Sequence, residues 1–134
     1  MRKSKINISG FKIGTAENRE GLTGVTVILA PDGGATAGVD VRGCAPGTRE
    51  TDLLDPRKTV QKIHAVVLSG GSAFGLEAAS GCVKYLAEQG VGFPIGNVCV
   101  PIVCSAVLFD LMIGDEKAYP DLLMGYEAAK SASS

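Results

Sequence analysis

The sequence has few of the residues that metal sites and serine-type triads require. Its 134 residues include one histidine, His64, and four cysteines, none of which stands in a C-x-x-C pair. A zinc site needs about four clustered ligands, so this spacing argues against one. A Ser-His-Asp triad would have to be built on His64 or not at all. We therefore expect neither a metal nor a cofactor.

Excess positive charge and long hydrophobic runs are also missing. Thirteen basic against 14 acidic residues give a net charge of -1, which leaves no basic surplus to hold a phosphate backbone. No run of 18 apolar residues occurs, and the basic residues 1–5 are not followed by the apolar core of a signal peptide. We expect a cytoplasmic protein that binds neither nucleic acid nor membrane, with reduced cysteines buried as small apolar groups.

The chain is rich in glycine and apolar residues instead. It has 18 glycines, 46% hydrophobic residues and only 20% charged residues. A chain of this length buries enough surface for one ordinary domain, and the many glycines favour tight turns over long helices. The composition predicts a single α/β domain over residues 1–134.

The first half of the chain predicts a hairpin followed by a loop. Residues 24–30 and 35–41 are strand-like and flank a Pro-Asp-Gly-Gly turn signal at 31–34, which predicts a β-hairpin. Residues 42–58 are polar and contain Gly43, Pro46, Gly47 and Pro56. A loop of that length inside a domain is typically functional or mobile.

A buried strand followed by a helix is the clearest local pattern. Residues 63–68 form a continuous apolar run, typical of a strand buried on both faces. Residues 73–89 follow with one apolar stripe and many small residues, which predicts a helix packed against a sheet. Ser72 is the expected N-cap of this helix and Gly90 its C-terminal glycine.

The last third of the chain predicts short strands and a terminal helix. Pro101 interrupts residues 98–103 and makes them an edge or extended segment. Residues 105–111 are the better strand candidate, and 114–117 form a turn. Pro120 opens a helix with Leu122, Tyr126 and Ala129 on one face.

The segment Ser69–Gly75 joins the buried strand to the helix and is the strongest candidate site. Such a junction aims backbone N–H groups and the positive helix end at one point, which suits an anion or a developing oxyanion. It is not a P-loop, because no Gly-Lys-Ser/Thr follows. It is not a nucleophile elbow on Ser72, because Phe74 stands where a glycine is needed. The alternative is that the glycines only allow a tight turn.

Other chemistry-bearing residues have simpler explanations. His64 lies within an apolar strand with no carboxylate beside it in sequence, as expected of a hydrogen-bonded core or interface histidine rather than a base. The carboxylates of Asp52, Asp55, Asp110 and Asp115 fit an active site, but each also fits a loop cap or a solvated turn.

Five motifs together resemble a known enzyme family. They are Gly21–Val27 (GLTGVTV), Asp40–Gly43 (DVRG), Pro46–Glu50 (PGTRE), Leu68–Ala78 (LSGGSAFGLEA) and Val107–Leu111 (VLFDL). In this order they resemble the S58 (P1) peptidase family, which includes D-stereospecific aminopeptidases of the DmpA type, β-peptidyl aminopeptidases and nylon-oligomer hydrolases. The resemblance runs from about Gly21 to Ala129.

The resemblance implies part of an αββα sandwich of the DmpA/ArgJ type. It implies an enzyme that cuts its own precursor, so that a new N-terminal Ser or Thr attacks a peptide or amide substrate with its α-amino group as base. That nucleophile lies in a downstream segment with no counterpart here. This chain would then be the N-terminal part of the larger subunit, completed by a missing C-terminal segment or subunit, and a homo-oligomer is expected.

The resemblance also indicates which residues line the substrate pocket. The candidates are Gly70, Gly71, Ser72, Phe74 and Phe109, and no nucleophile is expected among them. Phe109 aligns with a family tyrosine that helps to stabilise the oxyanion, and phenylalanine has no hydroxyl to donate. Two other classes stay open: a non-catalytic truncated fragment or interaction module of the same fold, and a small phosphate-binding α/β domain, which would lack the acidic ribose reader of a dinucleotide fold.

Overall fold

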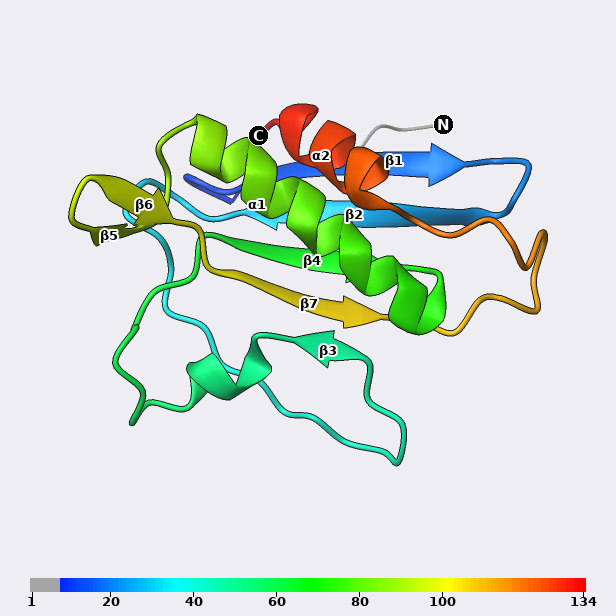
Figure 1. Cartoon of the computed structure of the whole chain (residues 1–134), viewed down its shortest axis with the longest axis horizontal. Coiled ribbons are helices and arrows are strands. Elements are labelled where there is room, and N and C mark those ends of the chain that lie inside the picture. The colour runs from blue at the N-terminus through cyan, green and yellow to red at the C-terminus, as the bar shows by residue number, and fades with distance from the viewer. Residues whose placement is uncertain (1–7) are drawn as a thin grey trace.

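Two helices cover one face of a five-stranded sheet in the computed structural model, which describes residues 8–134 (Figure 1). The elements in chain order are β1 (Lys12–Asn18), β2 (Thr23–Leu29), β3 (Thr48–Arg49), the 3₁₀ helix η1 (Thr51–Leu54), β4 (Ala65–Ser69), the 3₁₀ helix η2 (Ser72–Glu77), α1 (Ala78–Glu88), β5 (Phe93–Ile95), β6 (Val98–Val100), β7 (Val103–Val107) and α2 (Leu122–Lys130). The predicted α/β fold class is confirmed. The basic residues 1–5 lie outside the described residues.

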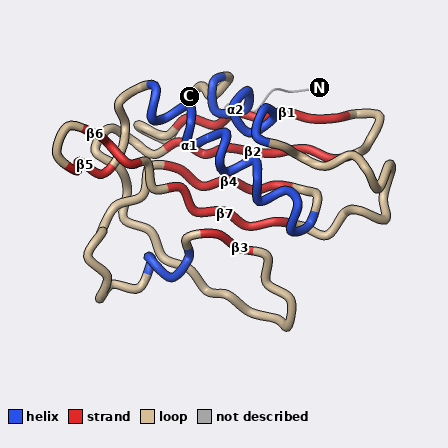
Figure 2. The backbone as a smooth tube through the Cα atoms, viewed as in Figure 1, coloured by secondary structure: helices blue, strands red, loops and turns tan. Residues whose placement is uncertain are grey.

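The sheet is mostly antiparallel and has the order β1-β2-β4-β7-β3. Only β4 and β7 are parallel, and the chain between them passes through η2, α1 and the β5-β6 hairpin (Figure 2). A parallel pair needs such a crossover, because the chain must return to the same end of the sheet. The crossover places the start of η2 at the carboxyl ends of both central strands.

The core lies between the sheet and the helices. Alternate residues of β2, namely Val25, Val27 and Leu29, face the helices and are buried, as the two-residue period of a strand requires. The helices approach each other at backbone distance, because a Cβ on Gly81 would meet the carbonyl oxygen of Leu122 and a Cβ on Gly125 that of Ala78. The small residues of both helices therefore allow a thin, closely packed α layer.

No helix of residues 8–134 covers the opposite face of the sheet (Figure 1), although this face carries apolar residues. Ile28 and Val66 on this face are half-buried, and Leu68 is 46% exposed. One helical layer on one sheet is half of the expected αββα sandwich. We call this uncovered side the open face.

The predicted hairpin at 24–41 is wrong. Residues 24–30 correspond to β2, but its hairpin partner is β1, while the second half, 35–41, contains only an isolated bridge from Ala35 to Ile63. The turn signal at 31–34 does reverse the chain locally, with a hydrogen bond from the Gly34 N–H to the Pro31 carbonyl. Residues 35–41 hold mostly small side chains and one glycine, Gly38, and offer the sheet little to pack.

The predicted strand and the helix after it are present as β4 and as η2 continued by α1. The prediction that this strand is buried on both faces is wrong, because Val66 is half-buried and Leu68 is exposed on the open face. Gly90 has a positive φ of 68° just after α1, as predicted for its C-terminal glycine. The N-cap assignment of Ser72 is wrong. Gly71 precedes the helical segment, and Ser72 has a left-handed φ of 52° with its N–H bonded to the Leu108 carbonyl.

The last third differs from the prediction in its strand limits. The strand expected at 105–111 is β7 at Val103–Val107, and Val98–Val100 pairs with β5 in a separate exposed hairpin. The last helix begins at Leu122 and is capped by Asp121, whose carboxylate accepts from the Met124 N–H. Of the predicted face, Ala129 is buried and Leu122 is 38% exposed, because the helix packs through its smallest residues.

The prediction that all cysteines are buried is half right. Cys82 and Cys104 are buried, whereas Cys44 and Cys99 are exposed, and all four are free thiols. Burial raises the pKa of Cys82 to about 12, and burial together with the nearby Glu50 raises the pKa of Cys104. Within residues 8–134, no three acidic, histidine or cysteine side chains converge as a metal site would need, and no helix could cross a membrane.

Candidate functional site

The junction between β4 and η2 is held by backbone hydrogen bonds to the neighbouring strands. The Gly70 N–H donates to the Gly24 carbonyl at 2.9 Å, and the Ser72 N–H donates to the Leu108 carbonyl at 2.8 Å. The Leu108 N–H returns a bond of 2.8 Å to the Ser69 carbonyl. These bonds fix the junction against the ends of β2 and β7.

A carboxylate occupies the position where the sequence led us to expect an anion. Oδ1 of Asp110 accepts from the Gly71 N–H at 2.6 Å, and Oδ2 accepts from the Thr23 hydroxyl at 2.8 Å. The N–H groups of Gly70, Gly71 and Ser72 are therefore all bonded within the chain, and none is free to hold a developing oxyanion. The junction binds its own anion.

Both glycines of the junction are required by geometry. A Cβ on Gly70 would meet the Asp110 carboxylate and the Thr23 hydroxyl, so only glycine leaves room for that hydrogen-bonded pair. Gly71 has a φ of 81°, and a Cβ there would lie 2.6 Å from the Cβ of Tyr119. Gly71 thus serves the turn, whereas Gly70 leaves space for the Asp110–Thr23 pair.

A groove runs along the open face beside the junction. It has a volume of about 610 Å³ and is lined by residues of β1 and β2 together with Gly70, Leu108 and Asp110. A smaller hollow of about 260 Å³ adjoins it between β2, β4 and β7, and Gly24, Thr26 and Gly70 line both. Gly70 is thus the candidate residue that borders the groove directly.

Two of the other candidates lie on the surface around the junction. Phe74 is 58% exposed and stacks on Tyr119 with ring centroids 4.7 Å apart, beside a separate depression of about 450 Å³ that also involves Met112. Phe109 is 67% exposed and borders neither the groove nor this depression. The structure therefore brings Gly70, Gly71 and Ser72 together and presents the two phenylalanines outside them.

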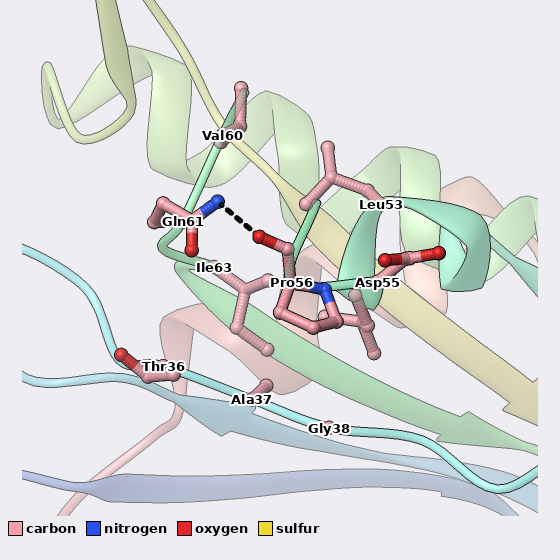
Figure 3. Close-up of a pocket in the computed structure, with 10 residues that line it drawn as sticks. Thr36, Ala37, Gly38, Leu53, Asp55, Pro56, Val60, Gln61 and Ile63 are labelled. Carbon is pink, nitrogen blue, oxygen red and sulfur yellow. Dashed lines mark hydrogen bonds between the residues drawn. The ribbon is translucent and has the colours of Figure 1, made fainter. Parts of the chain in front are cut away.

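The long polar loop has more structure than its composition predicts. It contains β3 and η1, and the Arg49 guanidinium reaches from β3 to the Ser80 hydroxyl of α1 at 2.7 Å. A pocket of about 250 Å³ lies between η1 and the flanking segments (Figure 3).

The polar groups of this loop pocket already have partners. Gln61 bonds the Pro56 carbonyl, the Thr36 hydroxyl accepts from Lys62, and Asp55 pairs with Arg57. The hydrogen bonds from Arg57 lower the pKa of Asp55 to about 2. What the pocket offers a ligand is therefore mainly apolar surface.

His64 lies at the other end of β4 from Ser72. Its Nδ1 accepts from the Ile102 N–H at 3.0 Å, and the residue is 6% exposed. Burial lowers the pKa of this histidine. The prediction of a hydrogen-bonded core histidine is confirmed, and the described residues do not bring an imidazole to any serine of the junction.

The sequence did not single out Thr23 or assign a partner to Asp110. Both lie inside motifs quoted above, and the loop-cap alternative for Asp110 agrees with the bonds it makes. The sequence does show that each is a polar residue at the end of an apolar segment. Thr23 stands beside Gly24, and Asp110 stands beside Phe109. Pairing the two required the sheet order, because they lie 87 positions apart.

Comparison with known proteins decides the family. Residues 5–133 match the family model described as Peptidase family S58. The chain belongs to peptidase family S58. An uncharacterized aminopeptidase of Mycobacterium leprae is 50% identical over 109 residues, 81% of this chain and 30% of that protein. A 6-aminohexanoate-oligomer endohydrolase of Kocuria sp. is 34% identical over 128 residues, 96% of this chain and 33% of that protein.

The fold resembles that of a solved aminopeptidase structure. A Burkholderia sp. beta-aminopeptidase superposes with a TM-score of 0.65 at 17% identity, covering 95% of this chain and 37% of that one. This S58 chain therefore spans about a third of the length of the relatives that it matches. The family resemblance indicated by the five sequence motifs is confirmed.

Proposed function

We propose that this chain is the N-terminal part of a self-processing aminopeptidase or amidase, acting on peptides or short amide oligomers. The S58 match over residues 5–133 carries the proposal. Relatives named as an aminopeptidase and as an oligomer endohydrolase both act, by name, on amide bonds.

The open face supports a composite site. The groove beside Gly70 is lined on this side by β1 and β2, and nothing in residues 8–134 closes it from above. A second layer from a downstream segment would cover Leu68 and Ile28 and complete a pocket. Exposed apolar faces of this kind are usually covered by another surface.

The nucleophile would come from that downstream segment. Ser72 is held in a left-handed conformation with its N–H bonded to Leu108. The single histidine lies at the other end of β4, where six residue steps of about 3.3 Å from His64 to Gly70 put it roughly 20 Å from the junction. A serine without a base within reach is a poor nucleophile. An N-terminal Ser or Thr with its own α-amino group needs no such base.

Processing and activity are tested together on the full-length protein. We expect two fragments on a denaturing gel, with Ser or Thr as the first residue of the smaller one, and turnover of aminoacyl p-nitroanilides or 6-aminohexanoate oligomers. The 134-residue chain alone should be inactive, because loss of a nucleophile costs a factor of about 10⁴ or more. Turnover by the 134-residue chain that Ser72→Ala abolishes would contradict the proposal.

The rival, a non-catalytic fragment, predicts different results. A full-length product that stays uncut and inactive, yet binds its S58 homologue as a subunit, would favour it. In either case the open face predicts that the isolated chain self-associates, in keeping with the expected homo-oligomer. A monomer by light scattering with a sharp cooperative melt would show that this face needs no cover.

A further inference from the structure

Another cavity lies at the end of the sheet far from the junction. It has a volume of about 420 Å³ and is enclosed by the start of β1, the end of β2 and the last turn of α1. Its polar lining residues are Lys12, Asp32, His64, Tyr85 and Gln89. Ligand pockets measure roughly 300–1,000 Å³, so this volume suits a small molecule. β4 separates it from Gly70 by roughly 20 Å, given about 3.3 Å per residue.

The deepest polar group of this cavity is the His64 imidazole. Its Nδ1 accepts from the Ile102 N–H, so in the neutral ring the proton must sit on Nε2. Burial lowers the pKa of His64 and keeps the ring neutral near pH 7. In the part of the chain that the structure describes, the imidazole makes no hydrogen bond through Nε2. His64 is 6% exposed and lines the cavity, and its Nε2–H has no protein acceptor within residues 8–134. This nitrogen is reached by solvent, because the fully buried side-chain atom without a partner in these residues is Ser105 Oγ.

Charges of both signs stand at the rim. Lys12 and Asp32 are exposed, and the ion pairs formed within residues 8–134 involve neither of them. The register pairs Lys12 with Leu29, and Asp32 follows Leu29 by three residues, so the two charges flank the same end of β2. The loop pocket of Figure 3 differs, because its polar groups are already paired.

The remaining wall is apolar. Leu29 and Leu86 are buried core residues that also line the cavity, and Pro31 and Val91 complete this side. One cation, one anion, a neutral N–H donor and an apolar wall match the groups of a single small zwitterion. A ligand with only one charge would engage only one of the two rim charges.

We propose that this cavity binds a free amino acid with an apolar side chain. Lys12 and the Nε2–H of His64 hold the carboxylate, Asp32 holds the ammonium group, and Leu29 and Leu86 receive the side chain. This site is separate from the groove beside Gly70 and does not depend on the function proposed for it.

The test uses the full-length protein carrying this chain, with L-leucine as the probe. L-Leucinol lacks the carboxylate and 4-methylpentanoate lacks the ammonium group, and neither contains a bond that an amidase cleaves. We expect saturable binding of L-leucine by titration calorimetry with a dissociation constant of about 1 mM or tighter, and binding of each analogue at least about tenfold weaker. The nitrogen resonance of His64, recognised by its absence in His64→Asn, should move with the same saturation.

Variants at the rim keep the test independent of folding. Lys12→Gln and Asp32→Asn change exposed residues and should each weaken leucine binding about tenfold or more, while the matched control Lys130→Gln should leave it unchanged. Leucine binding that survives both rim variants would place the amino acid elsewhere, for example as a product in the proposed catalytic site, and would overturn this inference. Equal binding of leucine and leucinol would overturn it as well.

Discussion

The carboxylate of Asp110 accepts the N–H of Gly71 at 2.6 Å, and this bond ties the end of β7 to the start of the helical crossover. Hydrogen bonds to a charged acceptor contribute about 1.5–3 kcal/mol each. Asp110→Ala removes the acceptor for both Gly71 and Thr23 and should lower the free energy of unfolding by at least about that amount. Asp110→Asn keeps an oxygen for Gly71 and should cost less. Chemical denaturation of both variants measures the difference, and equal losses would contradict the role of the N–H bond.

Gly70→Ala should destabilise the fold because its Cβ has no space beside Asp110 and Thr23. Overpacking of this kind costs about 1–3 kcal/mol. Gly38 offers a matched control, since a Cβ there meets nothing within 4 Å and no positive φ opposes it. Gly38→Ala should be neutral or stabilising by up to about 1 kcal/mol. Thermal melts of both variants provide the measurement, and similar Tm values would refute the steric argument.

Thiol reactivity should divide the four cysteines into two pairs. Cys44 and Cys99 are exposed and should react with a disulfide reagent in the native protein. Cys82, with a pKa of about 12, and Cys104, whose pKa is also raised, should react only after unfolding. The Cys44→Ser/Cys99→Ser double variant should therefore show no fast phase. A fast phase that persists in this variant would mean that the sheet opens on the reaction timescale.

Because of His64, we expect the free energy of unfolding to fall at mildly acid pH. Because its folded pKa lies below the ordinary value of 6.5, the unfolded chain binds a proton more readily than the folded one. Its contribution is complete above pH 6.5 and falls as the pH drops below that value toward the lowered pKa of the folded state. Unfolding free energies measured across this range should show that slope, and His64→Asn should flatten it. A slope that is unchanged in the variant would assign the effect to other groups.

Phe109→Tyr tests, in the full-length enzyme, whether a tyrosine hydroxyl at this position stabilises the oxyanion. An aimed oxyanion donor is worth roughly 3–4 kcal/mol, and a gain in kcat at constant KM would indicate a contact made only in the transition state. The Phe109 ring is 67% exposed rather than packed between sheet and helix, so the new hydroxyl should not lower Tm. Phe93→Tyr adds the same hydroxyl on the β5-β6 hairpin, away from the junction, and should leave kcat unchanged. An unchanged kcat in Phe109→Tyr would remove Phe109 from the oxyanion position.

Local patterns predicted the central elements and failed at the edges. β4 and α1 have strong local signals, because β4 is a continuous apolar run and α1 carries a stripe of small and apolar residues that packs against the sheet. β1 was missed because it is an edge strand with Gly14 and Glu17 in it, stabilised by pairing with β2 rather than by its own composition. β7 ends before the predicted limit because Leu108 and Asp110 leave the ladder to bond the junction. Such long-range bonds leave no trace in a sequence window.

The bridge between Ile13 and Ser133 joins the first strand to the segment after the last helix, 120 positions later. Gly14 of β1 lies so close to α2 that a Cβ there would meet the carbonyl oxygen of Ala128. Synthesis proceeds at about 5–20 residues per second, so the ribosome adds α2, the helix that covers β1, several seconds or more after β1 itself. During that interval the side of β1 that α2 covers in the finished fold stays exposed, and surface of this kind is what chaperones protect.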